Sequence, residues 1–251
     1  MNIDRPTNAQ IPALQQLWKQ AFGDSDAFLD DFFATGFSFD RCRCLDIEGK
    51  LAAAAYWFDC RWQGKKVAYI YAVATDTAFR GKGLCRALME DIHRQLQETG
   101  YAGAALVPGS KELFSLYEKL GYRSFCPMDT VTVAAGETAA QVQSLSGAEF
   151  DALREKFLPE NSILQAGQTT SFLASFAALY RAEDALFCAA IEKDNLYFQE
   201  YLGDPAKLPG IVAALGASKG IVRLPGGEDS AMYLPLDHDP ALPDYLGIPL
   251  N

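Results

Sequence analysis

The chain has 251 residues, of which 49% are hydrophobic and 22% are charged, and its formal net charge is −10. This composition is typical of a folded globular protein, and no segment offers the roughly 18 to 20 consecutive apolar residues that cross a bilayer. The chain lacks the clustered Lys and Arg that neutralise nucleic-acid phosphates, whereas its acidity favours a cationic small molecule or peptide amine. We therefore predict a cytoplasmic protein with no nucleic-acid or membrane partner.

Cysteine and histidine usage bears on disulfides and metals. The six cysteines are scattered, only Cys42 and Cys44 lie close together, and the two histidines are His93 and His238. No second pair of ligands stands at the spacing that a metal site needs. We predict reduced thiols and no metal.

The first half of the chain alternates helical and extended patterns. Residues 11–22 repeat apolar side chains at helical spacing, residues 51–62 and 66–75 form a hairpin, and residues 84–99 form a long helix that ends at Gly100. A short buried strand and a helix that begins after Ser110 follow. This order predicts an α/β (α+β) fold in which helices flank a mixed central sheet.

The second half predicts a smaller α/β domain. Residues 134–145 are mostly small or polar, which favours a domain boundary there. Helices are expected at residues 148–157, 171–180 and 209–216, and strands at 185–192, at 195–202 and in two short segments that end near Leu236. This half has no glycine-rich anion loop.

The segment that carries chemistry is AVATDTAFRGKGLCRALM, in which a strand, a loop with two glycines and a helix follow one another. The first N–H groups of a helix have no partner within it, so together with the helix dipole they form an anion site. Arg80, Lys82 and Arg86 add positive charge to this site. A solvated basic helix start would explain the loop alone equally well.

Two other phosphate motifs fail on spacing. A P-loop requires Lys and Ser or Thr after its last glycine, but Gly83 is followed by Leu84 and Cys85. The dinucleotide fingerprint requires a third glycine at position 86, which is Arg86.

The segment AVATDTAFRGKGLCRALM resembles motif A of the GNAT (GCN5-related N-acetyltransferase) family, and LYEKLGY, some thirty residues later, resembles motif B. Cys85 departs from the Gly or Ala of motif A, and Ser110 and Leu113 depart from the Asn and Ala of motif B. The resemblance covers residues 1–130. It implies a GNAT domain at residues 1–133, and the second half, residues 140–251, looks similar to a degenerate GNAT-like domain, which would make the chain a tandem member.

The resemblance implies acetyl-CoA as the cosubstrate and an N-acetyltransferase reaction in which a primary amine of a small molecule or peptide attacks the thioester directly. The pyrophosphate would lie on the glycine loop and the pantetheine along the preceding strand, with the N–H near Val73 donating to the thioester carbonyl. The cofactor-binding residues implied are Ala72, Val73, Ala74, Arg80, Gly81, Lys82, Gly83, Leu84, Cys85, Arg86 and Ser110.

Tyr117 is the catalytic residue that the resemblance implies, as the acid that protonates the departing CoA thiolate. Without the upstream loop, a core-packed aromatic would be the better interpretation of Tyr117. Many relatives carry a Glu as general base on the strand before the loop, where this chain has Tyr69, Ile70 and Tyr71. The base stays unassigned among a water held by Tyr69 or Tyr71, Asp76, a group of the second domain and the terminal carboxylate of Asn251.

Candidate substrate residues are the aromatic side chains Phe28, Phe32, Tyr69 and Tyr71, with nearby Asp residues to attract an amine. A core-facing aromatic stripe explains most of them better. Two further hypotheses remain open: a non-catalytic acyl-CoA sensor, favoured by the missing Glu, and a homodimer in which the second half is an interaction module.

Overall fold

The structure is a computed structural model that describes residues 1–237 and 239–250. The chain divides into two compact units: unit 1 is Met1–Arg123 with Met232–Leu242, and unit 2 is Ser124–Ala231 with Pro243–Asn251. The predicted domains, 1–133 and 140–251, are continuous segments, whereas each unit is built from two segments. In the described part of the chain, no helix has the length and apolar character to cross a membrane.

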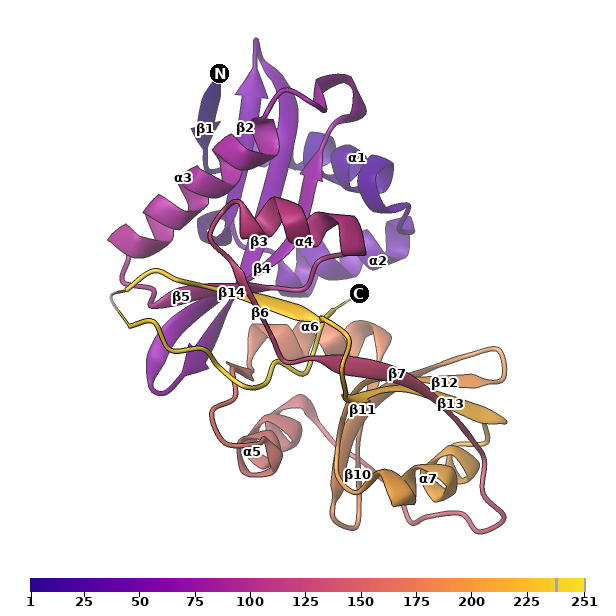
Figure 1. The fold of residues 1–251 in the computed structure, drawn as a ribbon. Coiled ribbons are helices and arrows are strands. Elements are labelled where there is room, and N and C mark those ends of the chain that lie inside the picture. The colour runs from indigo at the N-terminus through magenta and orange to yellow at the C-terminus, as the bar shows by residue number, and fades with distance from the viewer. Residues whose placement is uncertain (238, 251) are drawn as a thin grey trace. The chain divides into compact units, whose positions relative to one another are not determined.

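Unit 1 is a mixed sheet with helices on both faces (Figure 1). Its strands follow the order β1-β2-β3-β4-β5-β14. All neighbouring pairs in this order are antiparallel except β4 and β5. The strands are β1 (Asn2–Asp4), β2 (Cys42–Ile47), β3 (Lys50–Trp62), β4 (Lys65–Thr75), β5 (Gly103–Leu106) and β14 (Ala231–Pro235), and β6 (Arg123–Phe125) begins at the end of the unit's first segment.

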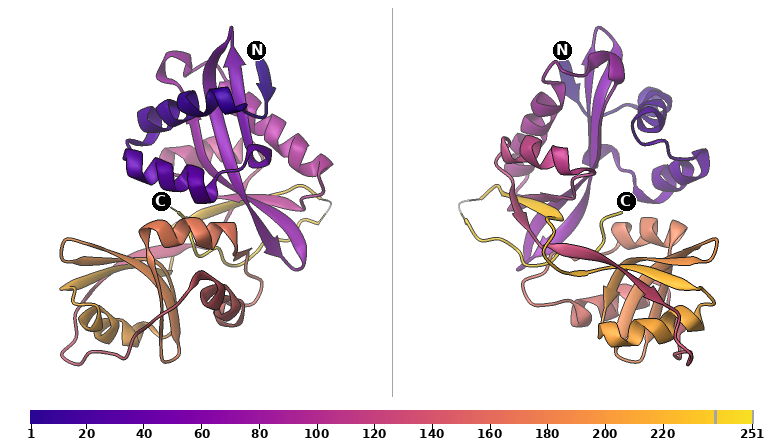
Figure 2. Two further views of the ribbon diagram at one scale, coloured as in Figure 1. Left: turned by 180° about the vertical axis from the view of Figure 1, so that it is seen from behind. Right: turned by 45° about the vertical axis from the view of Figure 1, so that its right-hand side comes forward.

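The helices α1 (Ile11–Phe22) and α2 (Asp26–Asp31) cover one face of this sheet, as the two views of Figure 2 show. The π-helical turn Phe32–Gly36 continues α2. Trp18 of α1 is buried, and its ring centroid lies 4.5 Å from that of Phe32 and 5.2 Å from that of Tyr56. The aromatic side chains of this region therefore pack against the sheet and form a core there, because the apolar face of an amphipathic helix is excluded from water.

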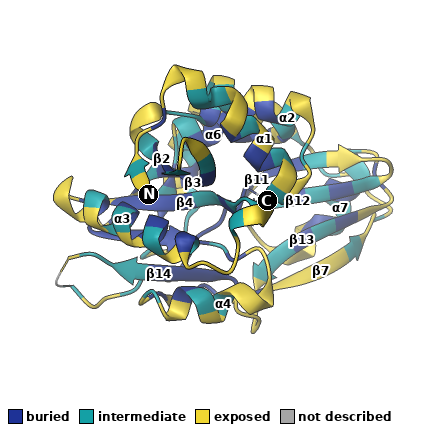
Figure 3. Ribbon diagram, turned by 90° about the horizontal axis from the view of Figure 1, so that it is seen from above, coloured by how far each residue is buried: buried dark blue, intermediate teal, exposed yellow. Residues whose placement is uncertain are grey.

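The helices α3 (Leu84–Glu98) and α4 (Lys111–Glu118) cover the opposite face, and Figure 3 shows buried, intermediate and exposed residues along both. Leu84, Leu88, Ile92 and Leu96 point into the core at the four-residue spacing that the sequence predicted. His93, also on α3, shares a 2.9 Å hydrogen bond with the hydroxyl of Tyr122, which follows α4. Burial lowers the pKa of His93 to about 4, so its imidazole is neutral near pH 7.

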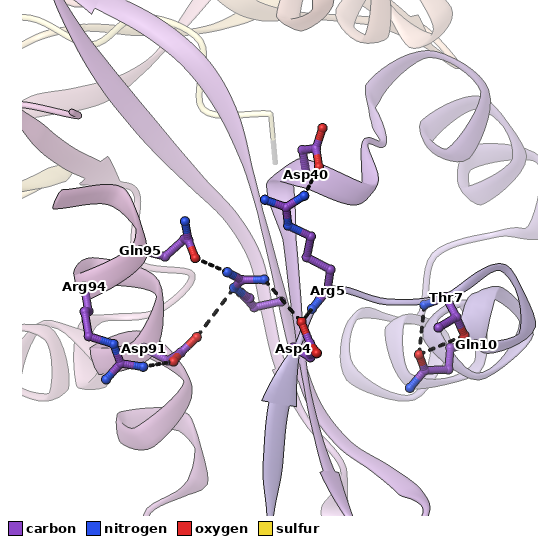
Figure 4. Close-up of polar contacts among 9 residues, drawn as sticks. Asp4, Arg5, Thr7, Gln10, Asp40, Asp91, Arg94 and Gln95 are labelled. Atoms are coloured by element: carbon purple, nitrogen blue, oxygen red, sulfur yellow. Dashed lines mark hydrogen bonds and ion pairs between the residues drawn. The ribbon is translucent and has the colours of Figure 1, made fainter. Parts of the chain in front are cut away.

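A buried guanidinium joins α3 to the edge of the sheet (Figure 4). Arg43 of β2 is 7% exposed, and its Nε lies 3.5 Å from the carboxylate of Asp91. The same side chain donates to Gln95 and lies 3.9 Å from Asp4 of β1. One charge thereby links two strands and a helix. Its partners offset part of the desolvation that burial imposes, and its buried Nε makes no hydrogen bond within the described residues.

Unit 2 has a sheet of strand order β7-β13-β12-β11-β10-β8, in which only β12 and β13 are parallel. Apolar side chains from β11, β12 and α7 form its core, among them Phe187, Phe198 and Ile211. The strands are β7 (Met128–Ala134), β8 (Gln143–Ser144), β10 (Ala178–Ala182), β11 (Ala185–Glu192), β12 (Asn195–Leu202) and β13 (Lys219–Pro225), with the short β9 at Leu164–Gln165. The helices are α5 (Gly147–Phe157), α6 (Gln168–Phe176) and α7 (Leu208–Ala214).

One element of the second half is a correction. The helix expected at residues 171–180 ends at Phe176, and Tyr180 lies in β10, opposite Phe187 of β11. The rings of Tyr180 and Phe187 stack with centroids 5.3 Å apart. Cross-strand pairing of aromatic residues thus determines the structure here, where the helical spacing of Phe172, Phe176 and Tyr180 suggested a continuation of the helix.

A buried ion pair lies in the interior of unit 2. The side chains of Arg154 and Glu200 are both 0% exposed, with Nε–Oε2 and Nη2–Oε1 distances of 2.6 and 2.8 Å. Arg154 also donates to the carbonyl of Gln165, and Tyr245 donates to Glu200 at 3.3 Å. The amide of Gln165 exchanges two hydrogen bonds with the backbone of Ile248, so the network holds the segment around Ile248 inside the unit.

We expect Arg154→Met to lower the free energy of unfolding by about 3–5 kcal/mol, because it leaves the Glu200 carboxylate buried without its partner. The double variant Arg154→Met with Glu200→Leu should recover most of that loss, since it removes both charges. Urea unfolding of the full chain, followed by circular dichroism, measures both. If the single and double variants lose the same free energy of unfolding, the buried Glu200 charge is not the cause of the loss.

The lowered pKa of His93 predicts a pH dependence of stability. The unfolded chain binds a proton at His93 below about pH 6.5, whereas the folded chain does so only near pH 4, so this contribution is full above pH 6.5 and is lost as the pH falls to 4. Between pH 7.5 and 5.0 it amounts to about 2 kcal/mol. His93→Gln should lose correspondingly less stability over that interval in urea titrations at the two pH values. If the wild-type protein and His93→Gln lose the same stability between the two pH values, the pKa of His93 is not lowered in the folded protein.

Candidate functional site

The candidate site begins where two parallel strands of unit 1 diverge. The ladder between β4 and β5 runs from Val67 and Gly103 to Tyr69 and Ala105. Beyond Tyr69, β4 continues to Thr75 paired with β3, and its other edge has no strand partner among the described residues. The end of β4 therefore offers backbone groups to a ligand rather than to a neighbouring strand.

A β-bulge lies in this free segment of β4. Tyr56 pairs with Tyr71 and Ala54 pairs with Ala74, so that Ala72 and Val73 together lie opposite Ala55. Ala72 has a φ of +48°, which an L-residue adopts only when the surrounding structure enforces it. Such bulges alter the direction of a strand next to functional sites. The structure thus places the three predicted residues 72–74 at an irregular, partly open edge.

The loop after β4 is shaped by its own polar contacts. Asp76 accepts a 2.8 Å hydrogen bond from the N–H of Ala78 and starts the 3₁₀ turn Thr77–Phe79. Gly81 and Gly83 then adopt φ angles of +74° and +75°, and a Cβ atom on either one would have no neighbour within 4 Å. Positions 81 and 83 favour glycine because their φ angles are positive, and the space beside both residues is open.

Unpaired donors line this loop. The N–H groups of residues 81–86 make no hydrogen bond to any of the residues described, and the Gly83 carbonyl accepts from Ala87 as α3 begins. Such N–H groups, at the positive end of a 15-residue helix, attract an anion. The sequence-predicted residues Gly81, Lys82, Gly83, Leu84, Cys85 and Arg86 are therefore brought together at one helix terminus.

The three basic side chains lie at the surface of this loop. Arg80 donates from Nε to the carbonyl of Thr75 at 3.1 Å, and Lys82 donates to the carbonyl of Ala78 at 3.3 Å. Arg86 reaches the carbonyl of Lys119, at the end of α4, at 3.4 Å. Each keeps further donors for an incoming anion, because an Arg has five N–H groups and a Lys three.

Tyr117 lies on the last turn of α4 and is 6% exposed, packed in the core between α3 and the sheet. Its hydroxyl has no hydrogen-bond partner in residues 1–237 and 239–250, and it is not among the fully buried polar atoms that lack one. The ring is therefore held by packing, while the hydroxyl is left available to solvent or a ligand. This is the arrangement that a proton donor requires.

The Tyr117 side chain is largely buried, and Cys85 lies near it. Burial raises the pKa of Tyr117 well above the usual value for a phenol, and the nearby Cys85 thiol adds to this effect when charged. Burial also raises the pKa of Cys85, so this thiol is not a nucleophile near neutral pH. Tyr117 and Cys85 thus bring the end of α4 next to the first turn of α3.

Ser110 occupies the N-cap position of α4 but makes no side-chain cap hydrogen bond. Instead, its hydroxyl interacts with the exposed carboxylate of Glu112 and lowers the pKa of that group. Helix capping by the Ser110 side chain is therefore not seen, and its contact with a cosubstrate stays a prediction.

The four candidate substrate residues belong to the aromatic cluster under α1 and α2. Phe32 and Tyr69 are each 1% exposed, whereas Phe28 and Tyr71 are partly exposed. The ring centroid of Tyr71 lies 5.5 Å from that of Trp18, and Trp18 donates a 2.7 Å hydrogen bond to Asp24. Phe32 and Tyr69 thus serve the core, and a role in substrate contact stays a prediction best suited to Phe28 and Tyr71.

The candidate bases have different surroundings. The Asp76 carboxylate accepts from the loop backbone, and the low exposure of Tyr69 leaves Tyr71 as the more accessible tyrosine. Burial raises the pKa of Tyr71 well above its usual value, so it can hold a water but does not itself ionise near pH 7. Asn251 lies outside the described residues.

Sequence reasoning missed His93 and Tyr122 as partners. Tyr122 was matched only as part of motif B, and His93 was considered only as a potential metal ligand. Their contact joins residues 29 positions apart, which no local pattern reveals. The four-residue spacing from Met89 to His93 on the buried side of α3 was the only available signal.

Comparisons with known proteins bear on the fold. Among solved structures, GCN5-related N-acetyltransferases from Anabaena variabilis (TM-score 0.74, 16% identity) and Kribbella flavida (0.69, 17%) cover 94% and 92% of this chain and 73% and 70% of their own. Eis1 from Mycobacterium abscessus has a TM-score of 0.68 at 12% identity and covers 94% of this chain and 74% of its own. These identities show a shared fold. A comparison with curated proteins finds no match.

The fold prediction is therefore confirmed: the chain has the GNAT fold, with a mixed sheet flanked by helices and a second α/β unit. A family model described as an acetyltransferase (GNAT) domain matches residues 2–125. That range includes the bulge in β4, the glycine loop and Tyr117. Residues 2–125 thus form a GNAT acetyltransferase domain.

Proposed function

We propose that the protein is an N-acetyltransferase that moves the acetyl group of acetyl-CoA to a primary amine of a small molecule or peptide by direct attack. The observation that carries the proposal is the open turn at residues 81–86, where a row of N–H groups at a helix terminus has no protein acceptor. A diphosphate matches this row in charge and in hydrogen-bonding capacity. We further propose that residues 140–251 are a degenerate GNAT-like domain, which has no such loop.

The residues present fit the cosubstrate. Nothing lies within 4 Å of a Cβ atom placed on Gly81 or Gly83, so a phosphate can approach the backbone there. Arg80, Lys82 and Arg86 supply charge beside it, and residues 72–74 supply backbone groups for the pantetheine arm. Acetyl-CoA would provide an acetyl group activated as a thioester.

Two groups of this chain would serve the transfer itself. The N–H near Val73, at the bulge, would donate to the carbonyl oxygen as negative charge develops on it. The Tyr117 hydroxyl carries its proton throughout the neutral range and would give it to the leaving sulfur.

The amine must be neutral to attack, and for a lysine-like amine deprotonation at pH 7 costs about 4–5 kcal/mol. A water held at Tyr71 is one route for that proton, and the base itself stays unassigned. The net charge of −10 favours cationic acceptors such as polyamines, aminoglycosides or lysine-containing peptides.

The alternative is a non-catalytic acyl-CoA-binding module. The observation that favours it is the absence of a carboxylate from residues 69–73, where relatives carry a general base. Thiol release from acetyl-CoA over a panel of primary amines separates the two. Amine-dependent release supports the enzyme, and CoA binding without release supports the module.

We expect Tyr117→Phe to lower kcat by about one to three orders of magnitude while the affinity for acetyl-CoA changes little, because the substitution removes only the proton that the leaving sulfur needs. Steady-state thiol release and calorimetric titration with CoA measure the two quantities. Turnover equal to that of the wild type would remove Tyr117 from the mechanism.

We expect Gly83→Ala to weaken CoA binding by about tenfold or more, equal to about 1.4 kcal/mol or more, because its Cβ would lie where a phosphate approaches. Gly100→Ala is the matched control: Gly100 has a φ of +80°, lies at the other end of α3 and is equally open. Both substitutions strain the backbone by about 1–2 kcal/mol. Calorimetry showing equal CoA affinity in the two variants would argue against a phosphate at Gly83.

A further inference from the structure

The turn that carries Tyr117 is closed by Tyr122. Gly121 has a φ of +92°, and the N–H of Tyr122 donates to the carbonyl of Tyr117 at 3.1 Å, which ends α4 in a Schellman-type cap. The two rings meet edge to face, with centroids 5.7 Å apart and planes at 68°. Tyr122 therefore touches Tyr117 through both its backbone and its ring.

The other end of Tyr122 is fixed to α3. Its side chain is 2% exposed, and its hydroxyl shares the 2.9 Å hydrogen bond with Nε2 of His93. Burial raises the pKa of Tyr122 and lowers that of His93, so both groups are neutral near pH 7 and the hydroxyl can donate to the imidazole.

The helix that holds His93 also forms the anion loop. α3 begins at Leu84, directly after Gly83, and Arg86 in its first turn donates to the carbonyl of Lys119 at the end of α4. Two hydrogen bonds, one from the first turn of α3 and one from its middle, thus connect this helix to the turn that bears Tyr117.

We propose that His93 and Tyr122 are positioning residues that set where the Tyr117 hydroxyl lies relative to the anion loop, by tying the α4 turn to the helix that follows this loop. The proposal rests on the proposed acetyl transfer. Neither residue touches the substrate in this scheme. Each acts through Tyr117, whose own hydroxyl has no protein partner to hold it in place.

The physical reason for such a tether is the sensitivity of proton transfer to distance. A donor must come within about 2.6–3.2 Å of the atom it protonates, and a displacement of about 1 Å can lower a rate by about a hundredfold. A tyrosine held by packing alone keeps its ring plane but tolerates sliding along the helix axis. The His93–Tyr122 hydrogen bond opposes that sliding, since it is directional and fixes Tyr122, whose ring contacts Tyr117.

The test uses the full-length protein, acetyl-CoA and the most reactive amine of the panel. We expect Tyr122→Phe, which keeps the ring and the backbone cap, to lower kcat by about ten- to a hundredfold. The KM for acetyl-CoA should stay within about twofold, because the anion loop is unchanged. Tyr101→Phe is the control: it removes another buried tyrosine hydroxyl of unit 1, which bonds Trp57 and Asp59, and should leave kcat unchanged.

Two further variants separate positioning from folding. In His93→Leu with Tyr122→Phe, no polar group is left without a partner, so thermal stability should return toward the wild-type value while kcat stays low. His93→Gln, which retains a side chain able to bond the Tyr122 hydroxyl, should keep most of the activity. These variants keep the test valid if Tyr122→Phe folds poorly.

Recovery of kcat together with stability in the double variant would overturn the proposal, as would a Tyr122→Phe enzyme as active as Tyr101→Phe. If Tyr117→Phe abolishes turnover while the His93 and Tyr122 variants remain fully active, only the positioning role fails. A wild-type protein that releases no thiol with any amine would overturn the proposed function and this inference with it.

Discussion

The unpaired N–H groups of residues 81–86 are the constraint on which the arrangement of unit 1 depends. They exist because the first N–H groups of α3 have no partner within the helix and because two glycines with positive φ let the chain turn directly into α3. A row of donors without acceptors is unfavourable unless water or a ligand satisfies it. The other candidate groups lie around these N–H groups: the bulge at Ala72 precedes them on β4, and Tyr117 lies near Cys85.

The site is built on rigid elements rather than on loops alone. α3 is fixed to the sheet by its apolar face and by the buried Arg43, whose partners include Asp91 and Asp4. α4 is short, and its end is attached to α3 through Arg86 and His93. Under the positioning proposal, the Tyr117 hydroxyl is held by contacts between the two matched motifs and by His93, which lies outside both.

Local patterns predicted much of this structure. The helices at 11–22 and 84–98 and the strands at 185–192 and 195–202 follow from apolar spacing and from flanking glycines. The glycine loop followed from unsatisfied helix donors, and motif order then indicated the family. These features depend on neighbours in sequence, which is why the sequence alone reveals them.

Long-range features could not be found in this way. The return of the chain to unit 1 as β14 depends on pairing between Met232 and Leu106, and Tyr180 is a strand residue because it meets Phe187. The Arg154–Glu200 and His93–Tyr122 contacts join positions 46 and 29 residues apart. The aromatic side chains Phe28 and Phe32 repeat in a pattern that suits either a pocket or a core, and only their burial distinguishes the two uses.

Calorimetric titration of the wild-type protein with CoA and with pantetheine, which lacks the diphosphate and the nucleotide, tests the central claim most directly. The account predicts saturable binding of CoA, and affinity for pantetheine weaker by at least about a hundredfold, equal to about 2.8 kcal/mol. No heat with CoA, or equal affinity for the two compounds, would contradict the claim that the main-chain donors of residues 81–86 bind a diphosphate.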